Sequence, residues 1–273
     1  MAQTLILSAL AAAFFVQGSL LINGTEMHAQ LIFMQCRVTV VECVVAVANS
    51  ARLTIKNNCT YTIWPATLTG GGTPPIEHTG FKLAPGASQS VTALPKWSGR
   101  VWARTHCSTD PASGRFSCLS GDCGSGVVEC RGGGGAAPAT LVEFTMQGHD
   151  GTMDFYDVSC VDGFNLPVAV APAVRAGCNF TDCPVDLNSI CLRELQAKAP
   201  SGTVVGCKSA CLAFDTDRYC CRGAHGGGPN VCPPTNYSRF FKKECPRAYS
   251  YAYDDATSTF TCRNTDYIIT FCP

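Results

Sequence analysis

Hydrophobic and polar side chains alternate regularly at residues 141–146. Glu143 falls on one side of this run, and the apolar side chains fall on the other: Val142, Phe144 and Met146. A period of two predicts a half-buried strand. Residues 153–158 predict a second strand, which pairs back as a hairpin through a turn at residues 148–151. Opposed side chains on one face of such a pair lie about 5 Å apart, so Glu143 and Asp157 can share a surface. Taken alone, the pattern favours solvated carboxylates on an outer face.

Shorter alternating runs recur between Gly- and Pro-rich turns. The pattern predicts a hairpin over residues 51–64, a strand over residues 88–93, another from Gly99, and further strands at residues 166–170 and 256–271. Many short strands at this spacing are typical of an antiparallel β-sandwich or barrel.

Two segments have helical spacing instead. Residues 188–198 predict a helix that Asn188 caps and that ends before Pro200; its inward positions are Ile190, Cys191, Leu192 and Leu195. Residues 238–243 predict a second, shorter helix capped by Ser238.

The first fifty residues differ from the rest of the chain. They contain two apolar runs, at residues 5–21 and 38–48, which we interpret as a signal and targeting region that is removed. The small residues Ala48 and Ser50 before Ala51 suit signal peptidase, so we expect the mature chain to begin near Ala51. A membrane span is less favoured, because the first run is short and Glu42 interrupts the second.

The chain of 273 residues has 19 cysteines, a density that favours disulfides and an oxidising compartment. The sequence contains no Cys-x-x-Cys or His-Glu-x-x-His motif, so we expect no metal and no cofactor. Lys and Arg together number 20, as do Asp and Glu, and this balance argues against a nucleic-acid partner. Seventeen cysteines follow residue 50, so at least one is unpaired or pairs with another molecule.

Most of these cysteines lie in two loop-rich segments, four within residues 107–130 and nine within residues 178–245. The strand pattern is therefore interrupted twice. We predict one domain over residues 51–273 in three parts. The parts are a β-sandwich core (51–105, 143–184 and 246–273), a small disulfide loop region (106–142) and a helical disulfide-rich region (185–245).

Residues 114–130 are similar to the signature of the thaumatin family, in which spaced Gly, Gly-Asp-Cys and a closing Cys recur in order. Further family landmarks follow in order: Trp102-Ala-Arg-Thr105, Val161-Asp-Gly-Phe-Asn165, Tyr219-Cys-Cys221, Tyr237-Ser-Arg-Phe-Phe241 and Phe271-Cys-Pro273. The resemblance covers the whole predicted mature chain. It implies a mainly β, thaumatin-like antiparallel β-sandwich with two disulfide-rich loop domains, one of which contains short helices.

The resemblance also implies a disulfide pairing, which spacing alone does not give. The implied pairs are Cys59 with Cys272, Cys107 with Cys118, Cys123 with Cys130, Cys178 with Cys262, Cys183 with Cys245, Cys191 with Cys207, Cys211 with Cys220, and Cys221 with Cys232. Cys160 is then left over, at a position where the family usually has an aliphatic residue. We interpret it as a small buried hydrophobic residue with a free thiol; a redox or intermolecular role is the alternative.

Many antifungal members of the family have an acidic cleft built from one Arg, one Glu and three Asp. The matching positions are Arg100, Glu143, Asp157, Asp162 and Asp254. Arg104 is predicted on the same face as Arg100, and Asp255 adjoins Asp254. Asp157 and Asp162 are five residues apart, so a regular strand would point them to opposite faces. Both can line one cleft only if the chain leaves the strand near residues 159–161 or just before Gly163.

The resemblance implies a secreted, extracellular antifungal defence protein that binds fungal cell-wall β-1,3-glucan, with weak endo-β-1,3-glucanase activity in some members. Hydrolysis would use Glu143 as acid and Asp157 or Asp162 as its partner. Aromatic residues near the carboxylates could stack on sugar rings: Phe144, Tyr156, Phe164, Tyr251 and Tyr253. The alternatives are a non-catalytic protein that permeabilises fungal membranes and an inhibitor of a protease or amylase. We expect a monomer. The zero net charge weakens attraction to anionic membranes, so glucan binding ranks first.

Overall fold

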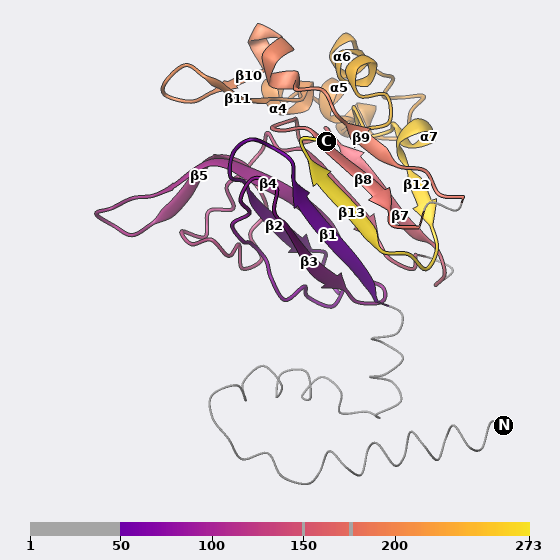
Figure 1. Ribbon diagram of the computed structural model, residues 1–273. Coiled ribbons are helices and arrows are strands. Elements are labelled where there is room, and N and C mark those ends of the chain that lie inside the picture. The colour runs from indigo at the N-terminus through magenta and orange to yellow at the C-terminus, as the bar shows by residue number, and fades with distance from the viewer. Residues whose placement is uncertain (1–49, 149–150, 175–176) are drawn as a thin grey trace, which may run out of the picture. The chain divides into compact units, whose positions relative to one another are not determined.

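The computed structural model describes residues 50–148, 151–174 and 177–273, so the predicted targeting region lies outside the described residues. The described chain forms two main β-sheets (Figure 1). The first has the strand order β3 (Ser88–Ala93), β1 (Ala51–Asn57), β13 (Tyr267–Phe271), β8 (Val168–Pro172) and β9 (Thr181–Cys183). The second has the order β12 (Phe260–Cys262), β7 (Asp154–Ser159), β6 (Leu141–Thr145), β4 (Ser98–Thr109) and β2 (Trp64–Thr69), and β5 (Phe116–Ser120) pairs with the far end of β4.

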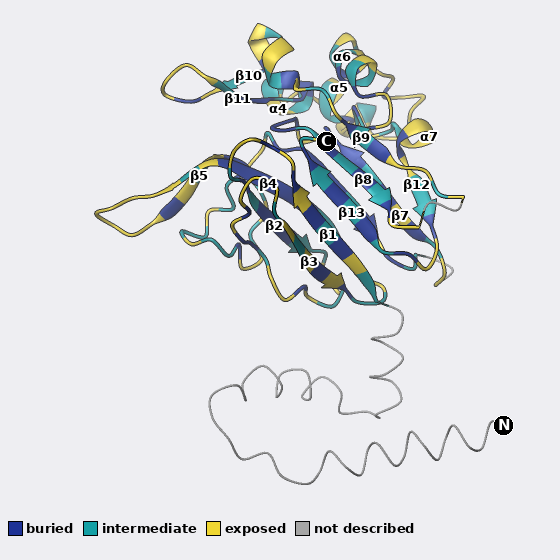
Figure 2. Cartoon of the chain, in the orientation of Figure 1, coloured by how far each residue is buried: buried dark blue, intermediate teal, exposed yellow. Residues whose placement is uncertain are grey.

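The main hydrophobic core contains the inward side chains of both sheets, and Figure 2 shows dark-blue buried positions alternating with lighter ones along their strands. Val142 and Phe144 of β6 are buried, as is Met146 beyond its end, which confirms the predicted inner face of that strand. The ring of Phe144 packs against Tyr156 and Tyr267. The core therefore fixes which faces of β6 and β7 point outward.

The predicted hairpin over residues 51–64 is wrong. Strand β1 pairs with β3 in antiparallel fashion and with β13 in parallel, whereas Trp64 begins β2 in the other sheet. Residues 58–63 connect β1 to β2. Asn57 holds this connection in place, because its side-chain amide donates to the carbonyls of Tyr61 and Leu83. The β1–β13 pair is also a parallel exception to the predicted antiparallel pairing.

Both faces of β4 are covered at its centre. Val101 and Ala103 face the main core, while Trp102 belongs to a second buried cluster with Ala66, Cys130, Ala139 and Leu141. Trp102 also donates its indole N–H to the carbonyl of Gly121. The small disulfide loop region thus covers a part of the six-stranded sheet that would otherwise face solvent.

The short helices lie beside the two sheets, together with a small hairpin (Figure 1). They are α4 (Ala210–Phe214), α5 (Asp217–Cys220), α6 (Asn236–Glu244), α7 (Asp255–Ser258) and the 3-10 turns η1 (Leu187–Ile190), η2 (Arg193–Leu195) and η3 (Gly223–His225). The hairpin joins β10 (Gln196–Lys198) and β11 (Val204–Cys207). No described helix has the length and apolar character needed to cross a membrane.

The predicted helix over residues 188–198 is wrong. Two 3-10 turns and strand β10 occupy this segment, because its end pairs with β11 and Cys191 is bonded to Cys207. Asp186 caps the first turn, and Ile190 is exposed. The predicted helix near residue 238 exists as α6, but Thr235 caps it in a capping box with Ser238.

Eight disulfides join the described cysteines, and they are the eight that the resemblance implies: Cys59–Cys272, Cys107–Cys118, Cys123–Cys130, Cys178–Cys262, Cys183–Cys245, Cys191–Cys207, Cys211–Cys220 and Cys221–Cys232. Among the described cysteines Cys160 has a free thiol and is fully buried, as predicted. Because long-range pairs such as Cys59–Cys272 close large loops, they restrict the unfolded chain most strongly.

Candidate functional site

Four side chains form a row across neighbouring strands of the six-stranded sheet. Leu68 of β2 is opposite Arg100 of β4, Arg100 is opposite Glu143 of β6, and Glu143 is opposite Asp157 of β7. These side chains share the outer face because their strand neighbours point into the core. Antiparallel pairing therefore brings together charges that lie far apart in the sequence.

The row lies in an open groove of about 410 Å³. Its rim and floor are formed by Leu68, Gly70, Ser98, Gly99, Arg100, Glu143, Phe144, Thr145, Phe155 and Asp157. Gly99 permits close packing beneath the groove, because a Cβ there would lie 2.4 Å from the carbonyl oxygen of Leu68 and 2.5 Å from the ring of the buried Trp97. The groove thus exposes carboxylates, a guanidinium and one partly exposed aromatic ring, that of Phe155.

Asp162 reaches Arg100 from beyond the end of β7. The strand ends at Ser159, and the chain turns so that the N–H of Gly163 donates to the carbonyl of Cys160. Gly163 has φ of 86°, in the left-handed region that glycine adopts readily. Oδ2 of Asp162 lies 3.5 Å from Nη1 of Arg100. The chain leaves the strand where the sequence predicted, and both Asp157 and Asp162 approach the Arg100–Glu143 pair.

The two opposed carboxyl groups have different electrostatic surroundings. Burial is the main cause that raises the pKa of Asp157 to about 8, and the charges of Glu143 and Asp255 contribute to the same shift. Its Oδ1 atom is buried and accepts no hydrogen bond from the described residues. Burial also raises the pKa of Glu143, but Arg100 opposes that shift and Asp162 adds to it. Asp157 is therefore the carboxyl group that the site favours in its protonated form.

The structure places the predicted Asp254 in a structural role. Its Oδ2 lies 3.0 Å from Nζ of Lys242 and accepts hydrogen bonds from the N–H and hydroxyl of Ser250. The neighbouring Asp255 instead interacts electrostatically with Asp157 and accepts a hydrogen bond from the hydroxyl of Tyr249. Of these two residues it is therefore Asp255 whose charge acts on Asp157, and the sequence indicated it only as the neighbour of Asp254.

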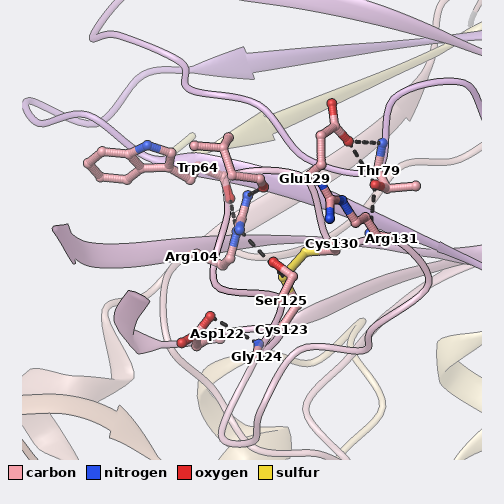
Figure 3. The surroundings of a disulfide bond; sticks show 12 residues. Trp64, Thr79, Arg104, Asp122, Cys123, Gly124, Ser125, Glu129, Cys130 and Arg131 are labelled. Atoms are coloured by element: carbon pink, nitrogen blue, oxygen red, sulfur yellow. Dashed lines mark hydrogen bonds between the residues drawn. A yellow bond between two sulfur atoms is a disulfide. The ribbon is translucent and has the colours of Figure 1, made fainter. Parts of the chain in front are cut away.

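Arg104 does not reach the groove, although it is on the same face of β4 as Arg100. Its side chain is buried beside the Cys123–Cys130 disulfide (Figure 3). Nε donates to the carbonyl of Trp64 and Nη2 to that of Val128. Burial lowers the pKa of Arg104 to about 10. The small disulfide loop region covers this end of the strand, so Arg100 alone of the two arginines faces the groove.

The exposed aromatic ring of the groove differs from the aromatic residues proposed on sequence proximity. Phe144, Tyr156 and Phe164 are buried, and Phe155 is the ring that the groove exposes. Its position two residues before Asp157 on a strand gives the same outward direction, so the period of two could have identified it.

As for metals, the described residues contain no group of three or more His, Cys, Asp or Glu side chains that could hold an ion.

Two packed β-sheets, eight disulfides and an acidic groove on one outer face are the features of a disulfide-stabilised β-sandwich protein. The family model described as the Thaumatin family matches residues 57–273, and the chain belongs to this family. It is 55% identical over 226 residues to "Thaumatin-like protein 1" of Pyrus pyrifolia, a match that covers 82% of this chain and 91% of the relative.

Two further relatives have names that describe a role. The chain is 53% identical over 221 residues to "Pathogenesis-related protein 5" of Arabidopsis thaliana, covering 81% of this chain and 89% of the relative. It is 51% identical over 228 residues to "Glucan endo-1,3-beta-glucosidase" of Prunus avium, covering 83% of this chain and 92% of the relative.

Proposed function

We propose that the protein is a secreted defence protein that binds β-1,3-glucan of fungal cell walls in the acidic groove. The observation that carries this proposal is the row formed by Arg100, Glu143 and Asp157 in an open groove beside the ring of Phe155. The names of the relatives from Arabidopsis thaliana and Prunus avium support a defence role and a glucan ligand, respectively.

The chemistry of the groove suits a neutral polyhydroxylated chain. Ionised carboxylates accept hydrogen bonds from sugar hydroxyls, and Arg100 can donate to ring or hydroxyl oxygens. The exposed face of Phe155 offers an apolar surface to the C–H face of a sugar ring. Because the groove is open to solvent, it permits binding within a long polysaccharide and not only at its end.

Weak endo-hydrolysis would need one protonated and one ionised carboxyl group. The opposed pair supports an assignment in which Asp157 is the acid, because the pKa of Asp157 is raised to about 8. Glu143 then serves as the ionised partner, since Arg100 stabilises its negative charge. This reverses the roles predicted from the sequence, and Asp162 assists by its contact with Arg100.

A binding and hydrolysis assay on protein with native disulfides tests both levels of the proposal. We expect retention on insoluble β-1,3-glucan but not on β-1,4-linked cellulose, with slow release of reducing ends. Retention should fall in the variants Arg100→Lys and Glu143→Gln. Glu194→Gln is the matched control, because it removes one exposed carboxylate of the helical region that lies outside the groove lining.

The outcomes separate binding from catalysis. Retention without reducing ends would leave a binding protein and remove the catalytic assignment. Absence of retention at every pH between about 4 and 8, the interval between the ordinary pKa of Asp157 and its raised value, would overturn the proposed ligand. Equal retention of Glu143→Gln and Glu194→Gln would place glucan binding outside this groove.

A further inference from the structure

Three cysteine sulfur atoms form a buried cluster on the inner side of the groove strand β7. Sγ of Cys160 lies 4.0 Å from Sγ of Cys183, which is bonded to Cys245. Cys160 and Cys183 are completely buried, and Cys245 is nearly so. A free thiol is therefore in contact with a disulfide in a space that solvent does not reach.

Each sulfur belongs to a different part of the fold. Cys160 follows β7 of the six-stranded sheet, Cys183 ends β9 of the five-stranded sheet, and Cys245 is the C-cap of α6. Strands β7 and β9 pack against each other. The present bond joins a sheet to a helix, whereas a bond between Cys160 and Cys183 would join the two sheets.

We infer that Cys160 is an internal nucleophile that exchanges with the Cys183–Cys245 disulfide, forming a Cys160–Cys183 bond and releasing Cys245 as the free thiol. The Cys160 thiolate attacks Sγ of Cys183, and the Cys183–Cys245 bond breaks as the new bond forms. The electron pair leaves on Sγ of Cys245, which takes up a proton in place of the one that Cys160 lost. One disulfide and one thiol are present before and after, so the step needs no oxidant or reductant.

The surroundings of Cys160 make this exchange slow at neutral pH. Burial raises the pKa of the Cys160 thiol to about 12, and the positive charge of Lys242 on α6 opposes that shift. Other titratable groups on the neighbouring segments are engaged elsewhere: on β9 Asp182 is paired with Arg247, and the neutral hydroxyl of Tyr249 donates to Asp255. Below that pKa the thiolate fraction, and with it the rate, rises about tenfold per pH unit.

Exchange weakens the fold around α6. The bond between Cys183 and Cys245 spans 62 residues, whereas Cys160 and Cys183 are 23 residues apart. A shorter loop restricts the unfolded chain less, so the exchanged form gains less stabilisation. It also frees the end of α6, the helix whose Lys242 bonds the carbonyl of Ala248 and the hydroxyl of Ser258.

Peptide mapping without reduction tests the exchange directly. The native protein is warmed below its unfolding transition at neutral pH and about two pH units higher, where the thiolate fraction is about 100-fold larger. It is then acid-quenched, alkylated under denaturing conditions and digested. We expect a Cys160–Cys183 cross-linked peptide to appear, with the alkyl label moving from Cys160 to Cys245 in equal amount. The rate should be about 100-fold higher at the higher pH and independent of protein concentration.

The matched control is Cys160→Val, which restores an aliphatic side chain at this position. This variant should keep Cys183–Cys245 under the same conditions and lose no groove residue. If it fails to fold, the label position and concentration independence in the unmodified protein still decide the question. Label that stays on Cys160 at both pH values, or that spreads over many cysteines in proportion to protein concentration, would overturn the inference.

Discussion

Glu143 and Asp157 are directly opposed in the antiparallel register of β6 and β7, so two carboxyl groups face one groove from adjacent strands. Their surroundings differ because Arg100 lies opposite Glu143 on its other side, whereas Oδ1 of Asp157 is buried without a donor from the described residues. This asymmetry assigns the proton to Asp157. It also gives the groove a measurable pH dependence.

The first prediction concerns stability against pH in Asp157→Asn. The pKa of Asp157 in the fold is raised from its ordinary value of 3.8 to about 8, so the folded chain keeps a proton that the unfolded chain loses. Wild-type stability should therefore fall as pH rises between about 4 and 8, by at most about 1.4 kcal/mol per pH unit from this residue. Denaturant unfolding with intact disulfides should show that the free energy of unfolding of Asp157→Asn, relative to that of the wild type, increases as the pH rises across this window. Parallel stability curves for the two proteins would contradict the assignment.

A second prediction distinguishes Asp255 from Asp254. Because the charge of Asp255 raises the pKa of Asp157, the substitution Asp255→Asn should lower that pKa, as followed by carboxyl-carbon NMR during titration. Asp254→Asn should leave the titration of Asp157 unchanged and instead destabilise the protein by about 1–3 kcal/mol, since Lys242 loses its ionic partner. If Asp254→Asn shifted the titration of Asp157 and Asp255→Asn did not, the match of Asp254 to the family's acidic cleft would be correct.

A third prediction compares the two arginines of β4. Arg104→Lys should lower the free energy of unfolding by about 2–4 kcal/mol, because an ammonium group cannot replace the bonds that the guanidinium makes to Trp64 and Val128. Arg100→Lys should change it by no more than about 1 kcal/mol, since its contact with Asp162 is partly exposed. Denaturant midpoints measure both effects. Similar losses in the two variants would mean that Arg100 is also a structural residue.

The fourth prediction tests the turn that presents Asp162. Gly163→Ala should be strongly destabilising, because a Cβ would lie 2.6 Å from Cβ of Pro138 and 2.7 Å from the carbonyl oxygen of Cys207. Gly114→Ala is the control, since Gly114 also has positive φ (70°) but no atom within 4 Å of an added Cβ. The left-handed backbone alone costs about 1–2 kcal/mol in each variant, and Gly163→Ala should lose clearly more. Equal losses in thermal or denaturant unfolding would show that the tight packing at Gly163 can relax.

Local patterns in the sequence were sufficient for several elements. The alternation around Glu143 identified the strand and its outer face, because a period of two in side-chain direction is a property of the extended backbone itself. The five-residue interval between Asp157 and Asp162 likewise required a break in the strand, and the turn at Gly163 provides it. Family motifs gave the cysteine pairs, which spacing alone leaves open.

Long-range pairing decided the features that local patterns predicted wrongly. Trp64 continues into the second sheet instead of returning along β1, because β1 finds its partners in β3 and β13. Residues 188–198 have helical spacing, yet pairing with β11 and the Cys191–Cys207 bond impose turns and a strand. In both cases interactions between distant segments outweigh a weak local preference.

The sequence by itself determined the residue types of the groove, the strands that carry Glu143 and Asp157, and the excess of one cysteine. Only the tertiary structure decided which of two similar groups acts at the groove. Arg100 lines it while the disulfide loop region covers Arg104, and the charge of Asp255 acts on Asp157 while Asp254 binds Lys242 and Ser250. The same holds for Cys160, whose contact with Cys183 arises where the two sheets pack together. Burial and pairing with distant segments set the protonation and the reactivity of these groups, and neither can be read from residues adjacent in the chain.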